Sequence, residues 1–265
     1  MSTLYARLLA ATVGLLTAFF GRWRRLTVLA RLSDRLAPEA RVTVNGTDIT
    51  LFVPDRTAVY WPRHGFASEP GTLAWIDGFS AGDVLYDIGA NVGIFTIYAA
   101  KAAGVRVVAF EPNPFSFRVL VRNLELNGIA GRVTPLCLAL GGATALESLA
   151  LSHMESGSGG NRLTGGKDGG GALSFETLAF GLDDLAGRLP APSRLKLDVD
   201  GNEPEILAGA RATLADPRLK SVLCEFDGQG EETYKAMDSL LRECGLVEDR
   251  TRPDDGSANR LYVRN

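Results

Sequence analysis

Histidine and cysteine are scarce in this chain. Its 265 residues include two histidines, His64 and His153, and three cysteines, Cys137, Cys224 and Cys244, all far apart. This pattern offers neither a zinc-binding spacing nor a disulfide framework. Cys137 and Cys224 lie in apolar runs, which indicates buried structural thiols and a reducing compartment. The sequence therefore argues against a histidine- or cysteine-ligated metal centre and against a disulfide-stabilised secreted domain.

The chain also lacks a large excess of charge of either sign. Its formal net charge is −3, with 22% charged and 46% hydrophobic residues. Without a positive excess, no broad electrostatic attraction to nucleic acid is expected, and no nucleic-acid partner is predicted. The length and composition are typical of one large globular domain, or of one such domain with an extension.

The apolar run near the N-terminus is too short to span a bilayer. It reaches from Leu8 to Phe20, 13 residues, whereas a spanning helix needs roughly 20. Most of the nearby arginines follow the run, which by the positive-inside rule keeps the body cytoplasmic. Three interpretations of residues 1–25 stay open: a helix packed on the body or on a partner, a membrane-surface or short anchoring helix, and a cleaved signal. The arginines are Arg7, Arg22, Arg24, Arg25 and Arg31.

Three regions follow one another along the chain. Residues 1–40 form an apolar and basic helical extension, and residues 41–80 predict a β-hairpin, with its turn at Asn45-Gly46, and a helix. In residues 81–265 apolar strands alternate with amphipathic helices, which predicts an α/β fold with a mostly parallel sheet and helices on both faces. The expected strands are residues 84–86, 105–110, 133–140, 194–199, 221–226 and 259–264, and the expected helices are residues 69–79, 93–103, 114–127, 204–214 and 231–244.

A glycine-rich insertion, residues 141–171, interrupts this alternation. From Ser156 to Gly171, eight of sixteen residues are glycine. This composition predicts a mobile surface loop or lid and not a packed element. Two roles stay open for it: a cover over the functional site, or a passive insertion.

The segment from Asp87 to Gly93 joins an expected strand to an expected helix. Its glycines permit a tight turn and close approach of a ligand. A dinucleotide-binding loop has glycine where Asp87 stands, because a carboxylate would repel a pyrophosphate. Asp87 suits a cationic ammonium instead, and S-adenosylmethionine carries an ammonium, a carboxylate and a sulfonium but no phosphate. We therefore predict S-adenosylmethionine as the cofactor, held at Asp87, Gly89, Ala90, Asn91 and Gly93.

Polar residues end the strands that follow. Glu111 ends the second strand and can bind both ribose hydroxyls. Lys196 and Asp198 alternate with leucines in the fourth strand, although a sheet covered on both faces should be apolar there, and burying such groups is costly unless they are paired. Ligands of open α/β sheets bind beyond the carboxyl ends of the strands. The candidate catalytic residues are therefore Lys196, Asp198, Asp200, Glu203 and Glu225, and Asp198 is also placed to meet the amino-acid end of the cofactor.

The acids near the fourth and fifth strand ends admit two interpretations. Asp200, Glu225 and Asp227 could bind a divalent ion such as magnesium, which would lower the pKa of a substrate hydroxyl. One of them could instead remove the hydroxyl proton during methyl transfer. The sequence favours the second interpretation, and we assign no metal ligands.

Five runs of residues together resemble one family. The runs Tyr-Asp-Ile-Gly-Ala-Asn-Val-Gly (86–93), Ala-Phe-Glu-Pro-Asn-Pro (109–114), Asn-Leu-Glu-Leu-Asn-Gly (123–128), Ala-Leu-Gly (139–141) and Leu-Lys-Leu-Asp-Val-Asp-Gly-Asn-Glu (195–203) occur in this order. They resemble the FkbM-type methyltransferases over about residues 69 to 226. The resemblance implies a class I methyltransferase fold with a seven-stranded sheet. It also implies methyl transfer, usually to a hydroxyl oxygen of a polyketide or saccharide.

The same resemblance implies a cofactor site. It assigns Asp87, Gly89, Asn91, Glu111 and Asn113 to S-adenosylmethionine, with Pro112 between the last two. Leu138 and Ala139, at the end of the third strand, would lie by the adenine. One position departs from the pattern, because Asp200 stands where the family often has glutamate.

Two other classes of protein compete with a methyltransferase. A nicotinamide-dependent oxidoreductase would have glycines suited to pyrophosphate at Asp87 and Asn91. A non-catalytic module could keep the cofactor fold without turnover, but the retained Lys196, Asp198 and Glu203 argue against that. The expected partner is a small-molecule or glycan acceptor. The sequence identifies neither that acceptor nor the oligomeric state.

Overall fold

The protein consists of two compact units, residues 1–38 and residues 39–265. They are seen in a computed structural model that describes residues 2–164, 173–226, 230–251 and 256–264. The sheet, both cavities and all the predicted site residues belong to the second unit. The arrangement of that unit is therefore what positions the chemistry.

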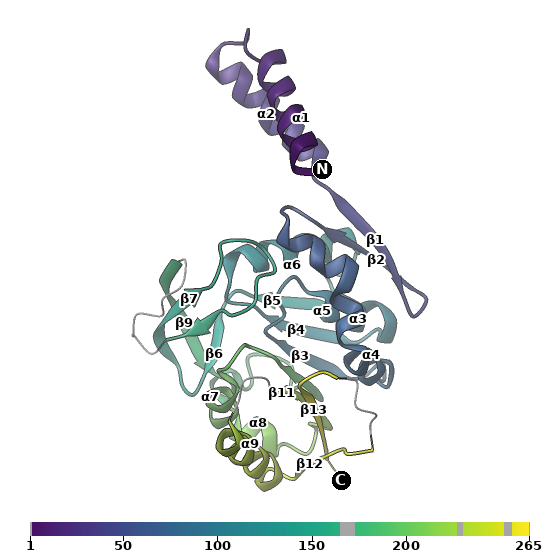
Figure 1. Ribbon diagram of the computed structural model, residues 1–265. Coiled ribbons are helices and arrows are strands. Elements are labelled where there is room, and N and C mark those ends of the chain that lie inside the picture. The colour runs from purple at the N-terminus through teal and green to yellow at the C-terminus, as the bar shows by residue number, and fades with distance from the viewer. Residues whose placement is uncertain (1, 165–172, 227–229, 252–255, 265) are drawn as a thin grey trace. The chain divides into compact units, whose positions relative to one another are not determined.

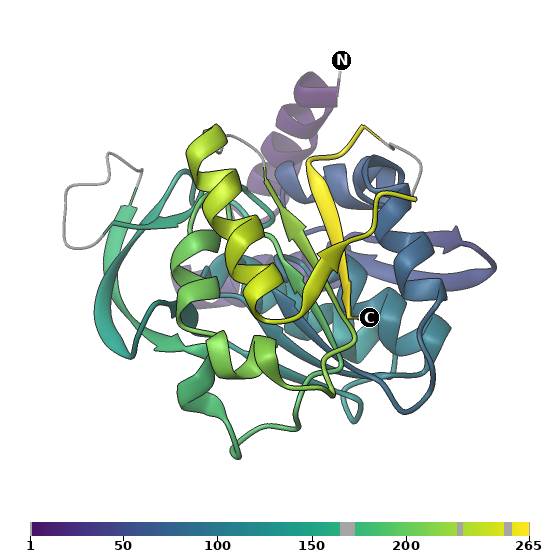
Figure 2. The same cartoon turned by 90° about the horizontal axis from the view of Figure 1, so that it is seen from below.

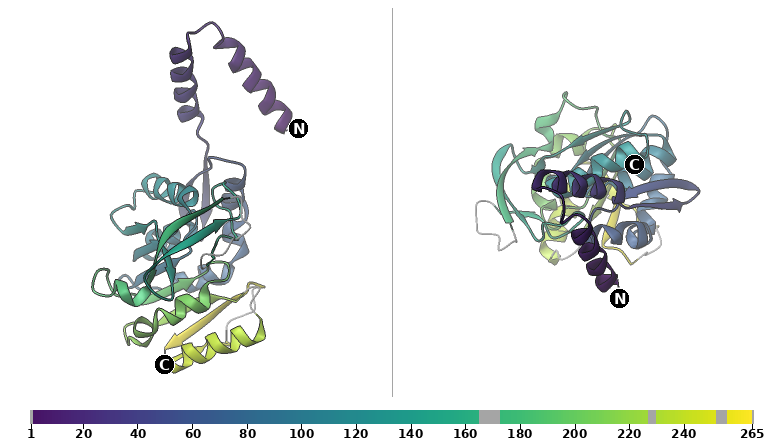
Figure 3. Two further views of the ribbon diagram at one scale, coloured as in Figure 1. Left: turned by 90° about the vertical axis from the view of Figure 1, so that its left-hand side faces the viewer. Right: turned by 90° about the horizontal axis from the view of Figure 1, so that it is seen from above.

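The N-terminal unit contains two helices where the sequence predicted one. These are α1 (Ser2–Leu16) and α2 (Arg22–Leu36), and Figure 3 shows them diverging from a short connection. The break falls at Gly21, whose extended backbone precedes α2. At about 1.5 Å per residue α1 is roughly 22 Å long, shorter than the ~30 Å apolar core of a bilayer. Within the described residues, no helix combines the length and apolar character needed to cross a membrane.

The second unit opens with the predicted hairpin. Strands β1 (Glu39–Val44) and β2 (Thr47–Phe52) pair antiparallel around Asn45 and Gly46, which have φ of 46° and 79°. Two residues with positive φ are what a tight two-residue hairpin turn requires. The backbone of β2 is tied to α6 (Pro114–Leu126), because the Phe52 amide donates to Asn123 Oδ1 at 2.7 Å. The hairpin therefore packs on the helix that follows the second strand of the sheet.

A seven-stranded sheet forms the centre of the second unit. Its strand order is β12-β13-β11-β10-β3-β4-β5 (Figure 1). All neighbours are parallel except at β13, which runs antiparallel to β11 and to β12. The predicted mostly parallel α/β sheet is thus confirmed. Its strands are β3 (Val84–Ile88), β4 (Arg106–Phe110), β5 (Val133–Leu136), β10 (Arg194–Leu197), β11 (Ser221–Glu225), β12 (Leu246–Glu248) and β13 (Asn259–Arg264).

Helices cover both faces of this sheet, as Figures 1 and 2 show. Side chains of β3 alternate between two cores: Leu85 packs in one, and Val84 and Tyr86 pack in the other. The first core is completed by α4 (Pro70–Asp77), α5 (Ile94–Tyr98) and α6, and the second by α7 (Glu203–Ala208), α8 (Arg211–Ala215) and α9 (Glu231–Glu243). Because side chains alternate across a strand, this explains the nearly continuous apolar runs.

Two predicted elements are shorter than expected. The strand expected over residues 133–140 ends at Leu136, and the chain then leaves the main sheet. Cys137 lies in that gap and is exposed, so the prediction that it is buried was wrong, whereas Cys224 in β11 is buried as predicted. The helix expected over residues 204–214 is divided into α7 and α8 beside Gly209, where a Cβ atom would lie 2.5 Å from the Gly141 carbonyl oxygen.

A second sheet occupies the insertion. Its order is β6-β9-β7-β8, with β6 (Ala139–Gly141), β7 (Ala145–Leu151), β8 (Arg162–Leu163) and β9 (Leu173–Gly181). Ser156 and Ser158, between β7 and β8, are both only 5% exposed. The prediction of an unpacked loop was therefore wrong for the described part of residues 141–171, because strand pairing and burial order it. Residues 165–172 lie outside the described residues.

Candidate active site

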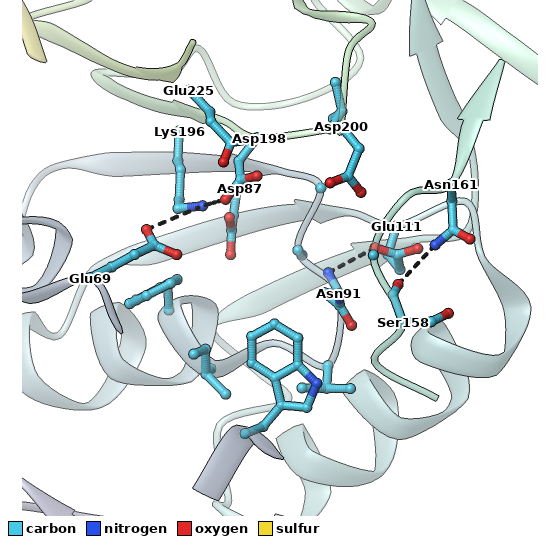
Figure 4. Close-up of a pocket in the computed structure, with 18 of the residues that line it drawn as sticks. Glu69, Asp87, Asn91, Glu111, Ser158, Asn161, Lys196, Asp198, Asp200 and Glu225 are labelled. Carbon is cyan, nitrogen blue, oxygen red and sulfur yellow. Dashed lines mark hydrogen bonds and ion pairs between the residues drawn. The ribbon is translucent and has the colours of Figure 1, made fainter. Parts of the chain in front are cut away.

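A cavity of about 240 Å³ opens where the strand order reverses. It lies beyond the carboxyl ends of β3, β4, β10 and β11, where open α/β sheets bind their ligands. Figure 4 shows Lys196, Asp198 and Glu225 grouped at one side of it, and Glu111 with Asn91 at the other. Ten of the predicted site residues line it: Asp87, Gly89, Ala90, Asn91, Glu111, Pro112, Lys196, Asp198, Asp200 and Glu225.

Asp87 lies at the mouth of the first turn, as predicted. It is 2% exposed and accepts a hydrogen bond from the Thr96 hydroxyl. Strand register places it beside Lys196 of β10. Burial raises the pKa of Asp87, although the Lys196 charge and the Thr96 hydrogen bond oppose that shift. A cationic group bound next to it would favour the ionised carboxylate, because opposite charges stabilise each other.

The glycines of this turn are required by the packing of the surrounding residues. Gly89 has φ of +82°, and a Cβ atom there would lie 1.7 Å from the Asp198 carbonyl oxygen. The absence of a side chain therefore lets the ends of β3 and β10 approach each other. Gly93 directly precedes α5, and a Cβ atom there would lie 2.2 Å from the Leu120 side chain; Gly93 lies outside the described cavity lining, whereas Ala90 is buried at the cavity wall.

Glu111 ties the first turn to the second. Its Oε2 accepts from the Asn91 amide at 2.7 Å, and its Oε1 accepts from the Asn113 amide at 2.8 Å. Burial raises the pKa of Glu111 to about 7. Asn113 uses its Oδ1 to cap α6, accepting from the Phe115 amide, and lies outside the lining described for either cavity. Through its oxygen Asn113 therefore shapes the second turn, while its Nδ2 is buried without a hydrogen-bond partner in the described part of the protein.

One polar atom in the cavity fits an absent ligand. Asn91 has φ of 52°, and its Oδ1 is buried without a hydrogen-bond partner in the described part of the protein. Buried polar atoms are normally paired, so this oxygen is suited to a donor on a bound molecule. The ammonium and ribose hydroxyls of S-adenosylmethionine are such donors. The residues present therefore fit that cofactor.

A smaller, mainly apolar cavity of about 40 Å³ adjoins the first. The two share Gly89, Pro112, Asn161 and Val199. Leu138 and Ala139, predicted to lie by the adenine, line the smaller one. An apolar slot beside a polar cavity is suited to an aromatic base.

Lys196 is the centre of a buried charge cluster. It is 2% exposed, and its ammonium contacts the Asp198 carboxylate and lies 3.9 Å from Glu69 Oε2. It also lies 5.1 Å from the centre of the Phe95 ring. Burial alone would lower the pKa of Lys196, but the Asp198 and Glu69 carboxylates raise it above its usual range. Lys196 is therefore a fixed positive charge.

Asp198 and Glu225 form a carboxyl pair beside that charge. A hydrogen bond joins their side chains. Burial and the Asp198 charge raise the pKa of Glu225, while Lys196 keeps the pKa of Asp198 below its usual value in spite of burial. At neutral pH Glu225 is thus the neutral donor, and Asp198 is the ionised acceptor.

The remaining two acids act on loop structure. Asp200 has φ of 60°, and its Oδ2 accepts from the Gly160 amide at 2.7 Å. Glu203 is 1% exposed, and its Oε1 accepts from the Val199 and Gly201 amides at 3.0 and 3.3 Å. Glu203 is absent from the described cavity lining. Asp200 therefore reaches the cavity, whereas Glu203 holds the turn after β10 in shape.

Several cavity residues were missed by the sequence analysis. Glu69 comes from the residue before α4, and Tyr60 and Trp61 precede it in the chain. Ser158 and Asn161 come from the insertion. Glu69 resembled an ordinary helix-start residue before Pro70, so no local signal marked it. The Tyr-Trp pair was a visible signal, because two adjacent aromatics stand there outside any expected strand or helix.

The metal interpretation gains no structural support. In the part of the chain that the structure describes, no three His, Cys, Asp or Glu side chains come together in a way that could hold a metal ion. Asp227, named in that interpretation, lies outside the described residues. His64 is exposed and packs beside Tyr60, with ring centres 5.5 Å apart, away from the cavity lining.

Comparison with known proteins agrees with the fold. A seven-stranded sheet with one antiparallel strand and an acidic first turn defines the class I, S-adenosylmethionine-dependent methyltransferases. Residues 87–247 match the family described as the methyltransferase FkbM domain. The chain belongs to the FkbM methyltransferase family. The match supports S-adenosylmethionine as its cofactor, as the sequence predicted, and does not support a nicotinamide-dependent oxidoreductase.

Three relatives illustrate the range of the similarity. The hexuronic acid methyltransferase AglP of Haloferax volcanii is 32% identical over 48% of this chain and 49% of its own length. The 31-O-demethyl-FK506 methyltransferase FkbM of Streptomyces tacrolimicus is 40% identical over 27% of this chain and 24% of its own. A tRNA (guanine(37)-N(1))-methyltransferase of Aedes aegypti is 39% identical over 32% of this chain and 14% of its own. The chain thus spans half or less of the length of these relatives.

Proposed function

We propose that this enzyme transfers the methyl group of S-adenosylmethionine to a hydroxyl oxygen of a saccharide, a polyketide or a similar metabolite. The observation that carries the proposal is the Asp198–Glu225 pair beside the buried Lys196, at the side of the cavity away from Glu111. One relative is named for a hexuronic acid, which supports a saccharide, and another for 31-O-demethyl-FK506, which supports a hydroxyl oxygen as the acceptor. The similarity to the tRNA methyltransferase covers a smaller share of that relative's own length.

The cofactor would be held at three places. Asp87 would receive its ammonium, Glu111 its ribose hydroxyls, and the slot at Leu138 and Ala139 its adenine. When bound, the sulfonium supplies an electrophilic methyl carbon. The protein then needs only to align an oxygen with that carbon and to exclude water.

Asp198 is the group that would take the hydroxyl proton. Lys196 keeps it ionised, so it can accept a proton as the oxygen attacks. Glu225 is neutral and donates to Asp198, which fixes the orientation of that carboxylate. Glu69 lies on the other side of Lys196 and completes the neutralisation of its charge. No covalent intermediate with the enzyme is needed.

Labelled methyl transfer to a panel of glycans, polyketides and lipids tests this function. We expect Asp198→Asn to lower kcat by about 10²- to 10⁴-fold, the usual contribution of a general base, with little change in S-adenosylhomocysteine affinity. Glu225→Gln should retain most of the activity, because the amide can donate as the neutral acid does. Binding of NAD in place of S-adenosylhomocysteine would contradict the proposal, and so would cofactor binding without transfer to any hydroxyl.

We also propose that residues 1–25 contact an anionic membrane surface from the cytoplasmic side. Residues 1–38 contain six arginines and one aspartate. Large apolar side chains of α1 and the following connection are exposed, such as Leu9 at 68% and Phe19 at 94%. Apolar and basic groups together are typical of helices that lie in the membrane interface.

Sedimentation of the full chain with phosphatidylcholine vesicles, with and without phosphatidylserine, tests this contact. Binding should require the anionic lipid and should be lost when Arg22, Arg24 and Arg25 are replaced by glutamine. Equal recovery with neutral vesicles would contradict the requirement for anionic lipid, and no binding to either vesicle would favour packing on the body or on a partner protein.

A further inference from the structure

Two segments far apart in the chain together form one wall of the cavity. Residues 55–61 precede the sheet, and residues 155–161 belong to the insertion. The Trp61 indole N–H donates to the Gly157 carbonyl at 3.2 Å, and the Ser156 amide donates to Asp55 Oδ2 at 3.0 Å. The Thr57 hydroxyl also donates to the Glu155 carboxylate. The two segments are therefore joined by backbone and side-chain contacts at successive positions.

Gly157 fixes the position of the Trp61 indole. Its φ is +79°, and a Cβ atom there would lie 2.1 Å from Trp61 Nε1. Its amide donates to the Ser116 hydroxyl at 3.0 Å, so the backbone cannot move away without losing a buried hydrogen bond. The wall is held again at Gly160, whose amide donates to Asp200. The shorter acid at position 200 thus reaches this segment.

The charge of the cavity limits what can enter. Its described lining contains six carboxyl groups and, as cations, Lys196 alone. Lys196 is already paired with Asp198 and Glu69, and among the six carboxyl groups Glu225 is neutral. An anionic acceptor would therefore meet an excess of carboxylates over cations, even with the positively charged cofactor bound. A neutral polar group would meet acceptors for its hydroxyl donors.

We propose that Tyr60 and Trp61, with the segment 155–161, form the acceptor subsite, and that this subsite takes a neutral ring bearing hydroxyl groups and rejects its carboxylate analogue. This inference rests on the proposed function and narrows its acceptor. The Trp61 ring offers an apolar face to the ring of the acceptor, and Tyr60 packs edge-on against Trp61, with ring centres 5.4 Å apart. Ser158 and Asn161 add polar groups to the same wall.

A matched pair of acceptors tests the charge of the subsite. Methyl hexosides and the corresponding methyl hexuronides differ only in a hydroxymethyl or a carboxylate group. We expect kcat/KM to be at least about tenfold higher for the neutral member, which corresponds to ~1.4 kcal/mol, and the product to be an alkali-stable ether. Equal turnover of the uronide, or an alkali-labile methyl ester as the product, would overturn the inference.

A matched pair of glycine variants tests the wall. Gly157→Ala should raise KM for the neutral acceptor about tenfold or more, because the new methyl group displaces Trp61, and should leave the Kd for S-adenosylhomocysteine within about twofold. Gly46→Ala is the control, since Gly46 has the same φ of +79° but open space around it. A similar KM in both variants, or a parallel loss of cofactor affinity in Gly157→Ala alone, would contradict an acceptor role for the wall.

Binding can be judged separately from turnover. Adding the neutral hexosides to the S-adenosylhomocysteine-saturated protein should quench tryptophan fluorescence, and the quench should disappear in Trp61→Phe. A quench without methyl transfer would contradict the proposed function but would still support the subsite. No quench and no transfer with every neutral hexoside would overturn the subsite, even if another hydroxyl acceptor were methylated.

Discussion

The ammonium nitrogen of Lys196 lies 3.9 Å from a carboxylate oxygen of Glu69. Glu69 precedes the first sheet strand, and its carboxylate also accepts from Thr72 and Asn259. The contact therefore links the start of α4, the fourth strand and the last strand at one point. This point is the side of the cavity where we place proton transfer.

Removal of the Lys196 charge should destabilise the fold. Lys196→Met leaves the buried Asp87 and the partly buried Asp198 and Glu69 without their cation, and breaking a buried pair costs about 3–5 kcal/mol. Urea unfolding of the full chain measures this free energy. Lys235→Met is the control, because Lys235 forms an exposed pair with Glu231 within α9, worth less than ~0.5 kcal/mol. Equal stability of the two variants would show that Lys196 is not needed for the cluster.

Neutralising Asp87 should weaken cofactor binding. Asp87→Asn keeps the size of the side chain and its contact with Thr96, but removes the charge that would receive the ammonium. We expect the Kd for S-adenosylhomocysteine to rise about 10- to 100-fold, the value of one charge-assisted hydrogen bond, and Asp87→Ala to abolish binding. Titration calorimetry measures both. Unchanged affinity would be decisive against the assignment of this turn.

Cofactor affinity should rise with pH through the ionisation of Glu111. Burial raises the pKa of Glu111 to about 7. In the ligand-free protein the protonated side chain is therefore the form that favours the folded state, and its contribution to the free energy of unfolding is lost as pH rises through about 7. Ribose hydroxyls that donate to both carboxylate oxygens favour the ionised form. The affinity for S-adenosylhomocysteine should therefore be roughly tenfold higher at pH 8 than at pH 6.

The control for this pH dependence is Glu111→Gln. It should bind more weakly, and its affinity should be independent of pH over the same range. A wild-type profile that is flat, or one that falls as pH rises, would show that Glu111 does not meet the ribose.

A side chain at Gly89 should disrupt the junction of β3 and β10. Gly89→Ala places a methyl group 1.7 Å from the Asp198 carbonyl oxygen at a φ of +82°. We expect a loss of more than about 2 kcal/mol in the free energy of unfolding, since both backbone strain and a clash with main chain contribute. Gly187→Ala, at φ of +76° with open space, measures the strain alone. Similar losses in both variants would mean that the close approach is unimportant.

The cofactor half of the site could be predicted because its residues are close in sequence. Asp87 to Gly93 form one turn, and Glu111 follows at the end of the next strand, so motif and spacing were sufficient to place both in the cavity. The parallel sheet was predictable for a similar reason, because burial on both faces requires apolar strands between amphipathic helices. The backbone contacts of Asn113 and Glu203 could not be predicted, since a helix cap and a turn-stabilising acid have the same composition as ligand-binding residues.

The acceptor half could not be predicted because it depends on contacts between distant segments. Glu69 meets Lys196, and Trp61 meets Gly157, only after the hairpin region and the insertion pack on the sheet. The insertion shows the same limit. Its glycines indicated a loop, but part of the insertion forms the antiparallel pair β7–β9. Gly157 lacks a side chain where the Trp61 indole packs against the backbone.

By itself the sequence determined the strand-and-helix alternation, the acidic first turn and the polar strand ends, because these follow from the periodicity and chemistry of short segments. Only the tertiary structure decided which of those polar groups share a proton, which support the backbone, and which aromatic side chains face the cavity. The physical reason is that pKa values and cavity shape depend on burial and on neighbours that the chain brings together only when it folds.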